Sequence, residues 1–312
     1  MPAPRVLLIG AGGQLGQELC RCLAPAAVLI PCTRTGAPVA TAPSLRCEAL
    51  DLREPDEGRQ LIARLRPDVV INAAAYNSVE QAEQDAASAW AINCDAVGAL
   101  AEACSLAGAR LVHYSTDYVF SGDGDRPWRE DDRAVPLNVY GASKLAGEEA
   151  VLASGCRHMI FRIAWLYAAH SHNFLRTMLR LAREGTPIRV VDDQCGTPTH
   201  ARWVADITTR ILASGAELSG TWHMAPDGRT TWFGFAREIF RAAAAEGLLE
   251  KAPQLVAVDS AGFPAVAPRP SWSVLDTSKL QHDFGVVPPD WREGVTAALR
   301  ELAGRESRPR DS

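Results

Sequence analysis

The sequence predicts an α/β fold in which a doubly wound parallel sheet is followed by a smaller C-terminal substrate-binding region. Over the first 166 residues, short apolar runs alternate with longer stretches of helical pattern. The apolar runs are nearly continuous, which is typical of parallel strands covered by helices on both faces. A glycine-rich stretch directly follows the first run, as it does in sheets that bind a dinucleotide. Together these features predict a Rossmann-type domain.

Six strands and four helices account for the first domain, residues 1–166, which we expect to bind the dinucleotide. Right-handed crossovers between parallel strands would place the helices on both faces of the sheet. The expected strands are residues 6–9, 27–30, 46–50, 68–72, 110–114 and 158–163, and the expected helices are residues 13–23, 55–65, 86–107 and 138–153.

The pattern loosens in residues 167–312, which we expect to form mainly the substrate-binding region, with some segments returning to the first domain. Helical patterns are joined here by loops rich in proline and glycine, which interrupt regular structure. The expected helices are residues 173–183, 201–213, 231–245 and 290–303, and the expected strands are residues 188–191 and 221–224.

The composition excludes several classes of protein. Apolar residues make up 47% of the 312 residues, and the net charge of −5 argues against binding to nucleic acid or a membrane surface. No apolar run approaches the ~18 residues that a membrane-spanning helix needs. The eight cysteines include no C-x-x-C pair, so we expect reduced thiols, no metal site and a cytoplasmic location.

The sequence Gly10-Ala-Gly-Gly13-Gln-Leu-Gly16 follows the first strand and opens the first helix. Glycines allow the backbone to turn tightly and to approach a pyrophosphate, whose charge is stabilised at the helix N-terminus. The alternative is a plain glycine-rich turn between a strand and a helix. The position of this stretch, directly after the first strand of an α/β chain, favours dinucleotide binding.

The residues after the second strand indicate whether the protein prefers NAD or NADP. Folds that prefer NAD commonly place Asp or Glu there, where it binds the ribose 2′-hydroxyl. Here the segment reads Pro31-Cys-Thr-Arg34 and contains no carboxylate. A guanidinium can bind a 2′-phosphate through a charge-assisted fork, so Arg34 favours NADPH, with NADH as the less favoured cofactor. The alternative is that Arg34 is a solvated loop residue.

Residues at two further strand ends are candidates for the same cofactor. Asp51 and Leu52 follow the third strand, where an Asp can reach the adenine edge. Ala73, Ala74 and Ala75 follow the fourth strand, and three small side chains allow a cofactor to lie close to the backbone. Each position is also compatible with simple packing at a strand end.

Tyr140 and Lys144 are the most informative pair in the chain. Lysine is rare, since only Lys144, Lys251 and Lys279 occur, and positions i and i+4 share one face of a helix. A cation beside a phenol lowers its pKa from about 10, which gives a proton donor and acceptor usable near neutral pH. The alternative is an amphipathic helix that carries one Tyr and one Lys.

Thr116 lies at the carboxyl end of the fifth strand, where open α/β sheets bind ligands. Its hydroxyl can hydrogen-bond a substrate carbonyl, and it completes a Thr-Tyr-Lys set with Tyr140 and Lys144. At these residues the chain resembles the extended short-chain dehydrogenase/reductase superfamily.

The resemblance narrows to the dTDP-4-dehydrorhamnose reductase family and runs from Val6 to about Leu302. Five stretches carry it. They are YSTDYVF at 114–120, PLNVYGASK at 136–144, NFLRTML at 173–179, DQCGTPT at 193–199 and RPSWSVLD at 269–276.

The resemblance implies an NADPH-dependent reduction of the C4 ketone of dTDP-4-dehydro-β-L-rhamnose to dTDP-L-rhamnose, the final step of dTDP-L-rhamnose biosynthesis. It implies that Tyr140 donates the proton, that Lys144 supports Tyr140 and the nicotinamide ribose, and that Thr116 assists at the sugar carbonyl. The implied cofactor positions are Gly10, Gly12, Gly13, Gln14, Leu15, Gly16, Arg34, Asp51, Leu52, Ala73, Ala74, Ala75, Tyr114, Tyr140 and Lys144, and the implied substrate positions are Thr116, Asp117, Trp165, Gln194 and Arg269.

Three positions depart from the family pattern. Relatives often have Ser or Thr where Ala164 stands and Asn where Trp272 stands. Arg202 replaces an acidic residue of some relatives. Mg²⁺ is implied by the family resemblance, but it would rely on such acids, so no metal ligand is assigned. Trp165 has an alternative as a core residue, and a homodimer is expected by analogy alone.

The sequence alone does not exclude several other functions. A sugar-nucleotide dehydratase shares the fold and the Tyr–Lys pair, but its pattern has Asp and then Glu after the Thr, whereas here Tyr118 follows Asp117. An epimerase would retain its cofactor through each turnover. A non-catalytic, NADP-binding regulatory subunit and a reductase of a different 4-keto-deoxysugar nucleotide are the remaining alternatives.

Overall fold

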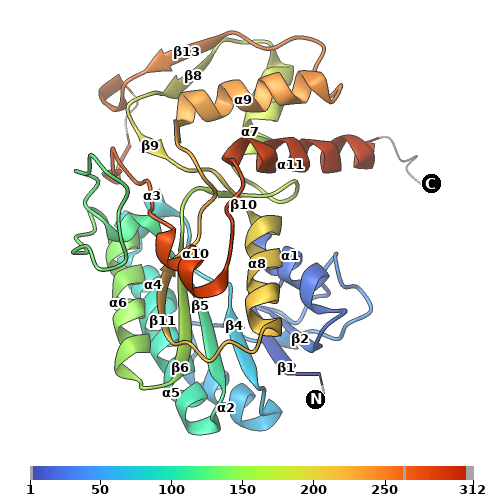
Figure 1. Ribbon diagram of the computed structural model, residues 1–312, viewed down its shortest axis with the longest axis vertical. Coiled ribbons are helices and arrows are strands. Elements are labelled where there is room, and N and C mark those ends of the chain that lie inside the picture. Colours follow the sequence, from blue (N-terminus) through green and yellow to red (C-terminus); the bar gives the residue numbers. More distant parts are fainter. Residues whose placement is uncertain (1–2, 263–264, 307–312) are drawn as a thin grey trace.

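A seven-stranded parallel sheet forms the centre of the protein (Figure 1). The computed structural model describes residues 3–262 and 265–306. The strand order is β11-β6-β5-β4-β1-β2-β3, so the chain begins inside the sheet and winds outward in both directions, which confirms the predicted doubly wound fold. The strands are β1 (Arg5–Ile9), β2 (Val28–Thr33), β3 (Glu48–Ala49), β4 (Val69–Asn72), β5 (Arg110–Thr116), β6 (Arg157–Ile163) and β11 (Gly220–His223).

Helices cover both faces of the sheet (Figure 1). Alternate residues of each strand point to opposite faces, so Leu7 and Leu111 enter one apolar core while Leu8 and Val112 enter the other. None of the described helices is long and apolar enough to cross a membrane. The helices on the face of Leu8 are α1 (Gln14–Leu23) and α8 (Ala201–Ala213), and those on the face of Leu7 include α2 (Pro55–Leu65), α5 (Ala96–Ala107) and α6 (Val139–Ala153).

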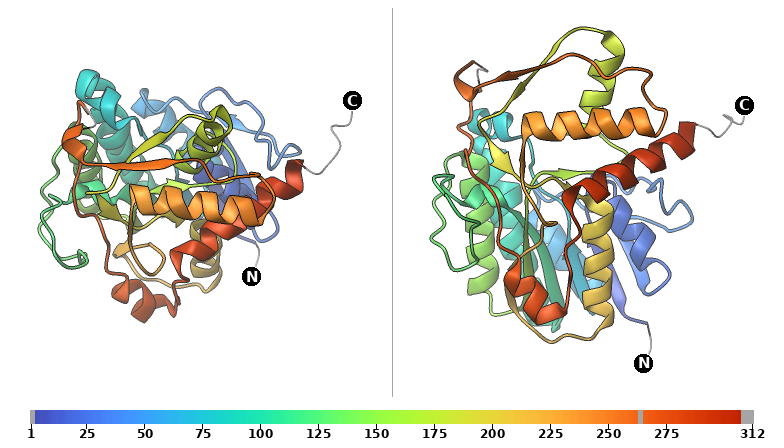
Figure 2. Two further views of the ribbon diagram at one scale, coloured as in Figure 1. Left: turned by 90° about the horizontal axis from the view of Figure 1, so that it is seen from above. Right: turned by 45° about the horizontal axis from the view of Figure 1, so that its top comes forward.

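A second, smaller layer lies beyond the carboxyl ends of the sheet strands (Figures 1 and 2). Its helices pack around a separate core that contains Phe235 and Trp291. Two late segments lie with the sheet instead, because β11 pairs with β6 and α8 packs on α1. A domain boundary at residue 166 stays a prediction. The elements of the second layer are α7 (Phe174–Glu184), β8 (Ile188–Val191), α9 (Trp232–Ala245), β13 (Leu255–Val258) and α11 (Trp291–Glu306).

Short elements connect the two layers. Parallel bridges join β7 (Leu166–Tyr167) to β10 (Thr199–His200), and β9 (Cys195–Gly196) pairs antiparallel with β12 (Thr230–Thr231). The sequence did not predict β13, α3 (Val79–Gln84) or α10 (Ser278–Phe284), which are short or lie among loop residues.

The outer edge of β11 is closed by side chains. Lys279 of α10 donates from Nζ to the carbonyl of Thr221 (2.7 Å), and the Glu130 carboxylate accepts from the backbone N–H of His223 (2.8 Å). Both backbone groups face away from β6. The exposed edge therefore has little unsatisfied hydrogen-bonding capacity at these positions.

Two predicted elements differ from the observed ones for identifiable reasons. β2 continues to Thr33, although it contains Pro31, because β3 pairs only with Cys32 and Thr33 and so requires no N–H from Pro31. The predicted helix over residues 86–107 is interrupted: α4 (Ala86–Trp90) is followed by a π-helical turn, Ala91–Asp95, before α5 begins. Such turns often occur at functional positions.

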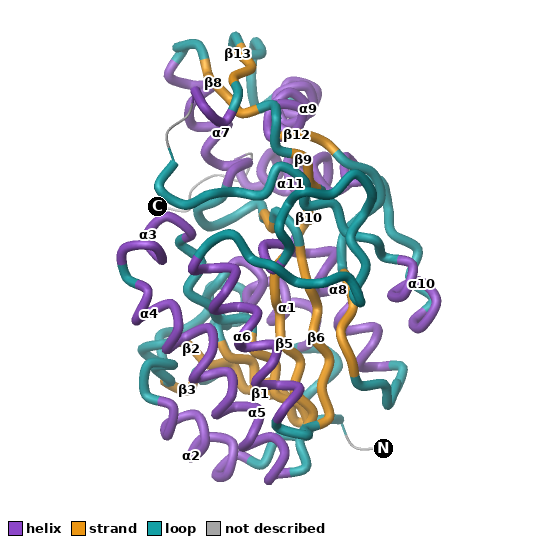
Figure 3. The backbone as a smooth tube through the Cα atoms, turned by 90° about the vertical axis from the view of Figure 1, so that its left-hand side faces the viewer, coloured by secondary structure: helices purple, strands orange, loops and turns teal. Residues whose placement is uncertain are grey.

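The π-helical turn supports α6 at close range. A Cβ added to Gly147 of α6 would lie only 2.1 Å from the carbonyl oxygen of Asn93. The Asn93 side chain accepts from the N–H of Tyr76 (2.9 Å) and donates to Oγ of Ser143 (3.1 Å). Glycine is therefore required for α6 to pack this closely on the π-helical turn. Figure 3 shows that α6 also runs beside β5.

We expect Gly147→Ala to lower the free energy of unfolding by ~1–3 kcal/mol, because the new methyl group overpacks the contact with Asn93. Denaturant unfolding measures this. Gly304→Ala is the matched control, since Gly304 is also helical but a Cβ there meets nothing within 4 Å; it should be neutral or stabilising by up to ~1 kcal/mol. Equal stability of Gly147→Ala and the wild type would contradict the assigned contact.

Candidate active site at the carboxyl edge of the sheet

The glycine loop after β1 presents bare backbone at the start of α1. Gly10 has φ +81°, and a Cβ there would lie 2.6 Å from the N atom of Ala74. Gly16 is equally confined, with a Cβ 2.1 Å from the Gly10 carbonyl oxygen. Gly12 and Gly13 are exposed. Because the N-cap Gly13 has no side chain to bond the first N–H groups of α1, these groups suit a phosphate.

The alanines after β4 lie against this loop. Ala73, Ala74 and Ala75 are partly exposed, and Ala74 donates its N–H to Oδ1 of the buried Asn72 (3.1 Å). The predicted cofactor residues Gln14 and Leu15 continue into α1, where Oε1 of Gln14 accepts from Nδ2 of Asn173 (2.9 Å). The loop and the alanines form a shallow surface to which a flat dinucleotide can lie close.

Arg34 and Asp51 lie just past the ends of the paired strands β2 and β3. Arg34 is exposed directly after β2. Hydrogen bonds from Arg53 lower the pKa of Asp51 to about 2, and the charge of Arg34 contributes to the same direction. Leu52 is buried beside them. The donor set therefore fits an NADP 2′-phosphate, since an exposed guanidinium is available where the second strand ends.

Thr116 and Tyr140 come together at the carboxyl end of β5. Thr116 is the last residue of β5, and Tyr140 lies in the first turn of α6, whose N-cap is Asn138. The Tyr140 ring packs edge-on against Tyr118, with 5.7 Å between the ring centroids. Tyr140 as a residue is partly exposed, although protein surrounds its phenol.

The predicted lowering of the Tyr140 pKa by Lys144 is wrong. Burial by the surrounding protein raises this pKa above its ordinary value, and a hydrogen bond with Thr116 offsets only part of the increase. The charges of Asp117 and Tyr118 act in the same direction as burial. Tyr140 is consequently a neutral phenol near neutral pH, which is the form that donates a proton.

Lys144 is turned toward β5. It is 1% exposed, and its Nζ donates to the carbonyl of Tyr114 (2.6 Å) and lies 3.2 Å from Nε2 of His113. Burial lowers the pKa of Lys144 to about 8. Tyr114 contributes only its backbone here, because its hydroxyl bonds Oγ1 of Thr208 on α8 (2.8 Å). The structure thus does not bring the Tyr114 side chain to the cofactor surface.

Asp117 is a buried carboxyl beside Thr116. Its Oδ1 accepts from the Thr116 hydroxyl (3.0 Å), and its Oδ2 has no hydrogen-bond partner in the described part of the chain. Burial raises the pKa of Asp117 to about 6, although the nearby Ser273 hydroxyl lowers it in part. The carboxyl is therefore available to accept from a substrate hydroxyl, and Ser273 is a neighbour that sequence reasoning missed.

A cavity of about 1280 Å³ is lined by residues of the second layer and by Asn77 and Glu80, which lie just before α3 and within it. Gln194 and Arg269, two predicted substrate residues, both line it. Gln194 donates from Nε2 to Oγ of Ser260 (2.9 Å), and Arg269 pairs with Glu80 (3.0 Å). A cavity of this size with aromatic and polar walls suits a nucleotide.

Trp165 is held in an unusual backbone conformation, with φ +45°. Its indole stacks on Trp232 at a centroid distance of 3.7 Å, and a Cβ on Gly196 would lie 2.5 Å from the ring. Trp232 itself lines the cavity. Trp165 and the cavity are therefore connected through an aromatic pair. The sequence offered no signal for Trp232, which looks like an ordinary first residue of a helix.

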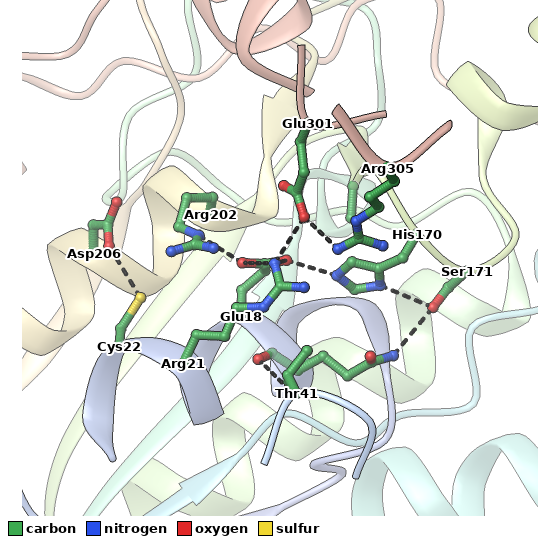
Figure 4. Close-up of polar contacts among 12 residues, drawn as sticks. Glu18, Arg21, Cys22, Thr41, His170, Ser171, Arg202, Asp206, Glu301 and Arg305 are labelled. Carbon is green, nitrogen blue, oxygen red and sulfur yellow. Dashed lines mark hydrogen bonds and ion pairs between the residues drawn. The ribbon is translucent and has the colours of Figure 1, made fainter. Parts of the chain in front are cut away.

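The described residues do not fit a Mg²⁺ ion. Among residues 3–262 and 265–306, no three His, Cys, Asp or Glu side chains gather as a metal site requires. Glu18 is 1% exposed and its carboxylate is bound by Arg202 (2.6 Å), His170 (2.6 Å) and Arg21 (3.0 Å). Figure 4 shows this Glu18 network, in which Arg21 also binds Glu301 of α11. Guanidinium groups thus occupy the oxygens that a cation would need.

Known proteins resemble this chain over nearly its full length. Residues 4–303 match the family model described as the RmlD substrate binding domain. A curated dTDP-4-dehydrorhamnose reductase of Burkholderia thailandensis is 42% identical over 308 residues, which cover 96% of this chain and 99% of that protein. One of Shigella flexneri is 41% identical over 300 residues, or 95% and 97% of the two chains.

A crystal structure also matches. It is that of dTDP-4-dehydrorhamnose reductase from Bacillus anthracis strain Ames in complex with NADP. The match has a TM-score of 0.86 at 33% identity and covers 96% of this chain and 99% of that one.

We expect the Glu18 network to govern stability in acid. The network lowers the pKa of Glu18 from 4.5 to about 2, so its contribution is complete above the ordinary pKa and is lost as the pH falls toward 2. A shift of this size corresponds to roughly 3 kcal/mol. Glu18→Gln should remove most of it near neutral pH and flatten the pH dependence of unfolding in acid.

The matched control is Glu184→Gln, which breaks an exposed pair with Arg180 and should cost less than ~1 kcal/mol. A chelator should leave the melting temperature of the wild type unchanged, because Arg202 and Arg21 already neutralise Glu18. Stabilisation by added Mg²⁺ would contradict the assignment.

Proposed function

The chain belongs to the family of the RmlD substrate binding domain, whose curated members among its relatives are dTDP-4-dehydrorhamnose reductases, and on that premise we propose that it reduces the C4 ketone of dTDP-4-dehydro-β-L-rhamnose with NADPH to give dTDP-L-rhamnose. One observation carries the proposal. Thr116 and Tyr140 meet at the carboxyl end of β5, the same edge of the parallel sheet at which the glycine loop follows β1.

The chemistry assigns a separate role to each side chain. Bound NADPH supplies the hydride that C4 accepts. Tyr140 donates its phenol proton to the C4 oxygen, so that ketone, hydride and proton together give the alcohol. The Thr116 hydroxyl, which donates to Asp117 in this structure, would turn to donate a hydrogen bond to the same oxygen. Lys144, with its pKa of about 8, is largely protonated near neutral pH. Because its Nζ bonds the carbonyl of Tyr114, it holds α6 against β5.

The binding of NADPH is supported by two features of the chain. The bare backbone of Gly10–Gly16 receives the pyrophosphate at the N-terminus of α1. Arg34 is exposed where the second strand ends and binds the 2′-phosphate. Leu52 and Ala73–Ala75 complete the surface under the adenine and the nicotinamide ribose.

In the proposed complex the sugar lies at Tyr140 and the nucleotide lies in the cavity. Asp117 accepts from a sugar hydroxyl through its free Oδ2, and Trp165 offers an apolar face to the deoxysugar. Arg269 and Gln194 line the cavity, where Arg269 faces the diphosphate of the dTDP group. The expected homodimer rests on resemblance to the family, and the expected cytoplasmic location rests on cysteines that show no disulfide framework. Light scattering of the purified protein measures the oligomeric state.

A non-catalytic NADP-binding subunit is the main rival. The retained donor set at Thr116, Tyr140 and Lys144 favours an enzyme. The decisive assay follows NADPH absorbance with the purified protein alone and a panel of 4-keto sugar nucleotides, both dTDP- and UDP-linked. Turnover restricted to the dehydrorhamnose nucleotide supports the proposal. Absence of NADPH oxidation at saturating substrate would falsify it, and turnover of another sugar would correct the substrate.

Tyr140→Phe should lose roughly a hundredfold or more in kcat, because it removes only the donated proton. Fluorescence titration should show nearly unchanged NADPH binding, since the glycine loop and Arg34 hold the pyrophosphate and the 2′-phosphate. Tyr114→Phe is the control: its hydroxyl bonds Thr208 away from the site, so kcat should stay within about threefold. An unaltered kcat in Tyr140→Phe would remove Tyr140 from the mechanism.

Arg34→Ala should weaken NADPH binding much more than NADH binding, by roughly tenfold or more, because only NADPH carries the 2′-phosphate that Arg34 binds. Dissociation constants for both dinucleotides measure this difference. Arg53→Ala serves as the comparison, since Arg53 is already paired with Asp51. Equal losses for NADH and NADPH in Arg34→Ala would exclude the assignment of Arg34.

A further inference from the structure

One wall of the cavity is a segment that we call the strap, residues 265–270. Residues Ala265 to Arg269 line the cavity, and Pro270 follows them. The strap has no regular secondary structure, so its position depends on the side chains that bind it. Two of these, Asn138 and Glu80, come from the part of the chain that forms the active site.

Asn138 bonds the strap and the catalytic helix α6 at the same time. It is the N-cap of α6, and its Oδ1 accepts from the N–H of Gly141 (2.8 Å). Its Nδ2 donates to the carbonyl of Pro268 in the strap (2.9 Å). Asn138 is only 6% exposed; its bond to Gly141 is buried and its bond to Pro268 is partly buried. Tyr140 lies two residues further along the same helix.

Glu80 of α3 binds the strap at three points. Its Oε2 accepts from the N–H groups of Val266 (2.8 Å) and Ala267 (3.3 Å), and its Oε1 accepts from Arg269 (3.0 Å). The same helix reaches α6, because Glu83 accepts from the N–H of Val139 (2.7 Å). The strap, α3 and the first turn of α6 are thus one hydrogen-bonded unit.

The far end of the strap is fixed to the loop after β5. Gly122 has φ +83°, and a Cβ there would lie 2.5 Å from Pro270. The carbonyl of Gly122 accepts from Oγ of Ser271 (2.9 Å) and from the N–H of Trp272 (3.1 Å). The strap is therefore held at both ends by segments that also border Thr116 and Tyr140.

We propose that Asn138 is a positioning residue: together with Glu80 it holds the strap in register with the first turn of α6, so that a sugar nucleotide bound in the cavity presents its ketone to Tyr140. The inference rests on the proposed function, because it takes the cavity to bind the nucleotide and Tyr140 to donate the proton. A ligand that spans both places reacts only if their separation is fixed. Loss of that register lowers the rate of the chemical step without removing either binding site.

The test separates the two bonds of Asn138. Asp and Ser are both good N-caps, so Asn138→Asp and Asn138→Ser keep the bond to α6, but neither carries the amide N–H that binds Pro268. Both variants should melt close to the wild type and lose roughly tenfold to a hundredfold in kcat. Their dissociation constants for NADPH and for dTDP alone should stay within about threefold. Asn138→Ala, which also lacks the cap, should melt lower.

Glu80→Gln is a second variant that tests the same proposal. It weakens the binding of the strap and leaves the cap of α6 intact, so it should lower kcat in the same way as Asn138→Ser. Glu184→Gln is the matched charge control on an exposed site and should leave kcat unchanged. Full kcat in Asn138→Ser and Asn138→Asp would overturn the proposal. Full kcat in Glu80→Gln would overturn the part of the proposal that gives Glu80 a role in holding the strap in register.

Hydrogen exchange tests the anchoring of the strap independently of enzymatic activity. In the NADPH-bound protein, the amides of Val266 and Ala267 should exchange faster in Asn138→Ser and in Glu80→Gln than in the wild type, since their bonds to Glu80 depend on the position of the strap. If the wild type oxidises no NADPH, the proposed function fails while this readout still decides the anchoring role. Unchanged exchange in both variants refutes that role.

Discussion

The close contact between Gly147 and the carbonyl of Asn93 is the constraint on which the active site depends. It allows α6 to pack closely on the π-helical turn, and the same helix carries Tyr140, which reaches Thr116, and Lys144, which reaches the backbone of β5. Asn93 adds a second function with its side chain, which binds Tyr76 in the segment after β4. The catalytic helix and the loop that approaches the cofactor are consequently positioned by one buried residue.

The electrostatics of the site follow from how the charges are distributed around Lys144. Glu148, one turn further along α6, is the acid that acts on Lys144, but Arg162 binds its carboxylate at 2.6 Å. Lys144 is left with the Tyr114 carbonyl and the His113 ring as its neighbours. Burial therefore dominates its pKa and that of Tyr140, and the site favours a neutral phenol opposite the ketone.

Local patterns in the sequence predicted the sheet and the motif-bearing segments well. The helices at 55–65 and 201–213 and the strand at 188–191 have the expected bounds, because apolar periodicity and turn residues act over a few positions. The helix over 86–107 was predicted without its π-helical turn, which depends on distant partners of Asn93. The prediction of a lowered Tyr140 pKa was wrong for a similar reason, since burial is a property of the folded chain.

The residues that sequence reasoning missed share one property: their partners lie far away in the chain. Trp232 stacks on Trp165, Glu80 binds Arg269, and Asn138 binds Pro268. Each is an ordinary residue in its own segment, a helix start or a helix cap. The glycine loop, Thr116 and Tyr140 were found because their spacing along the chain is itself the signal.

The closed edge of β11 has a consequence for the behaviour of the protein at high concentration. An open parallel sheet ends in a strand whose unpaired N–H and C=O groups can hydrogen-bond to another chain. At this edge Lys279 binds a backbone carbonyl and Glu130 binds a backbone N–H. A second molecule would have to displace both before it could extend the sheet, so these two side chains protect the protein against intermolecular β-aggregation.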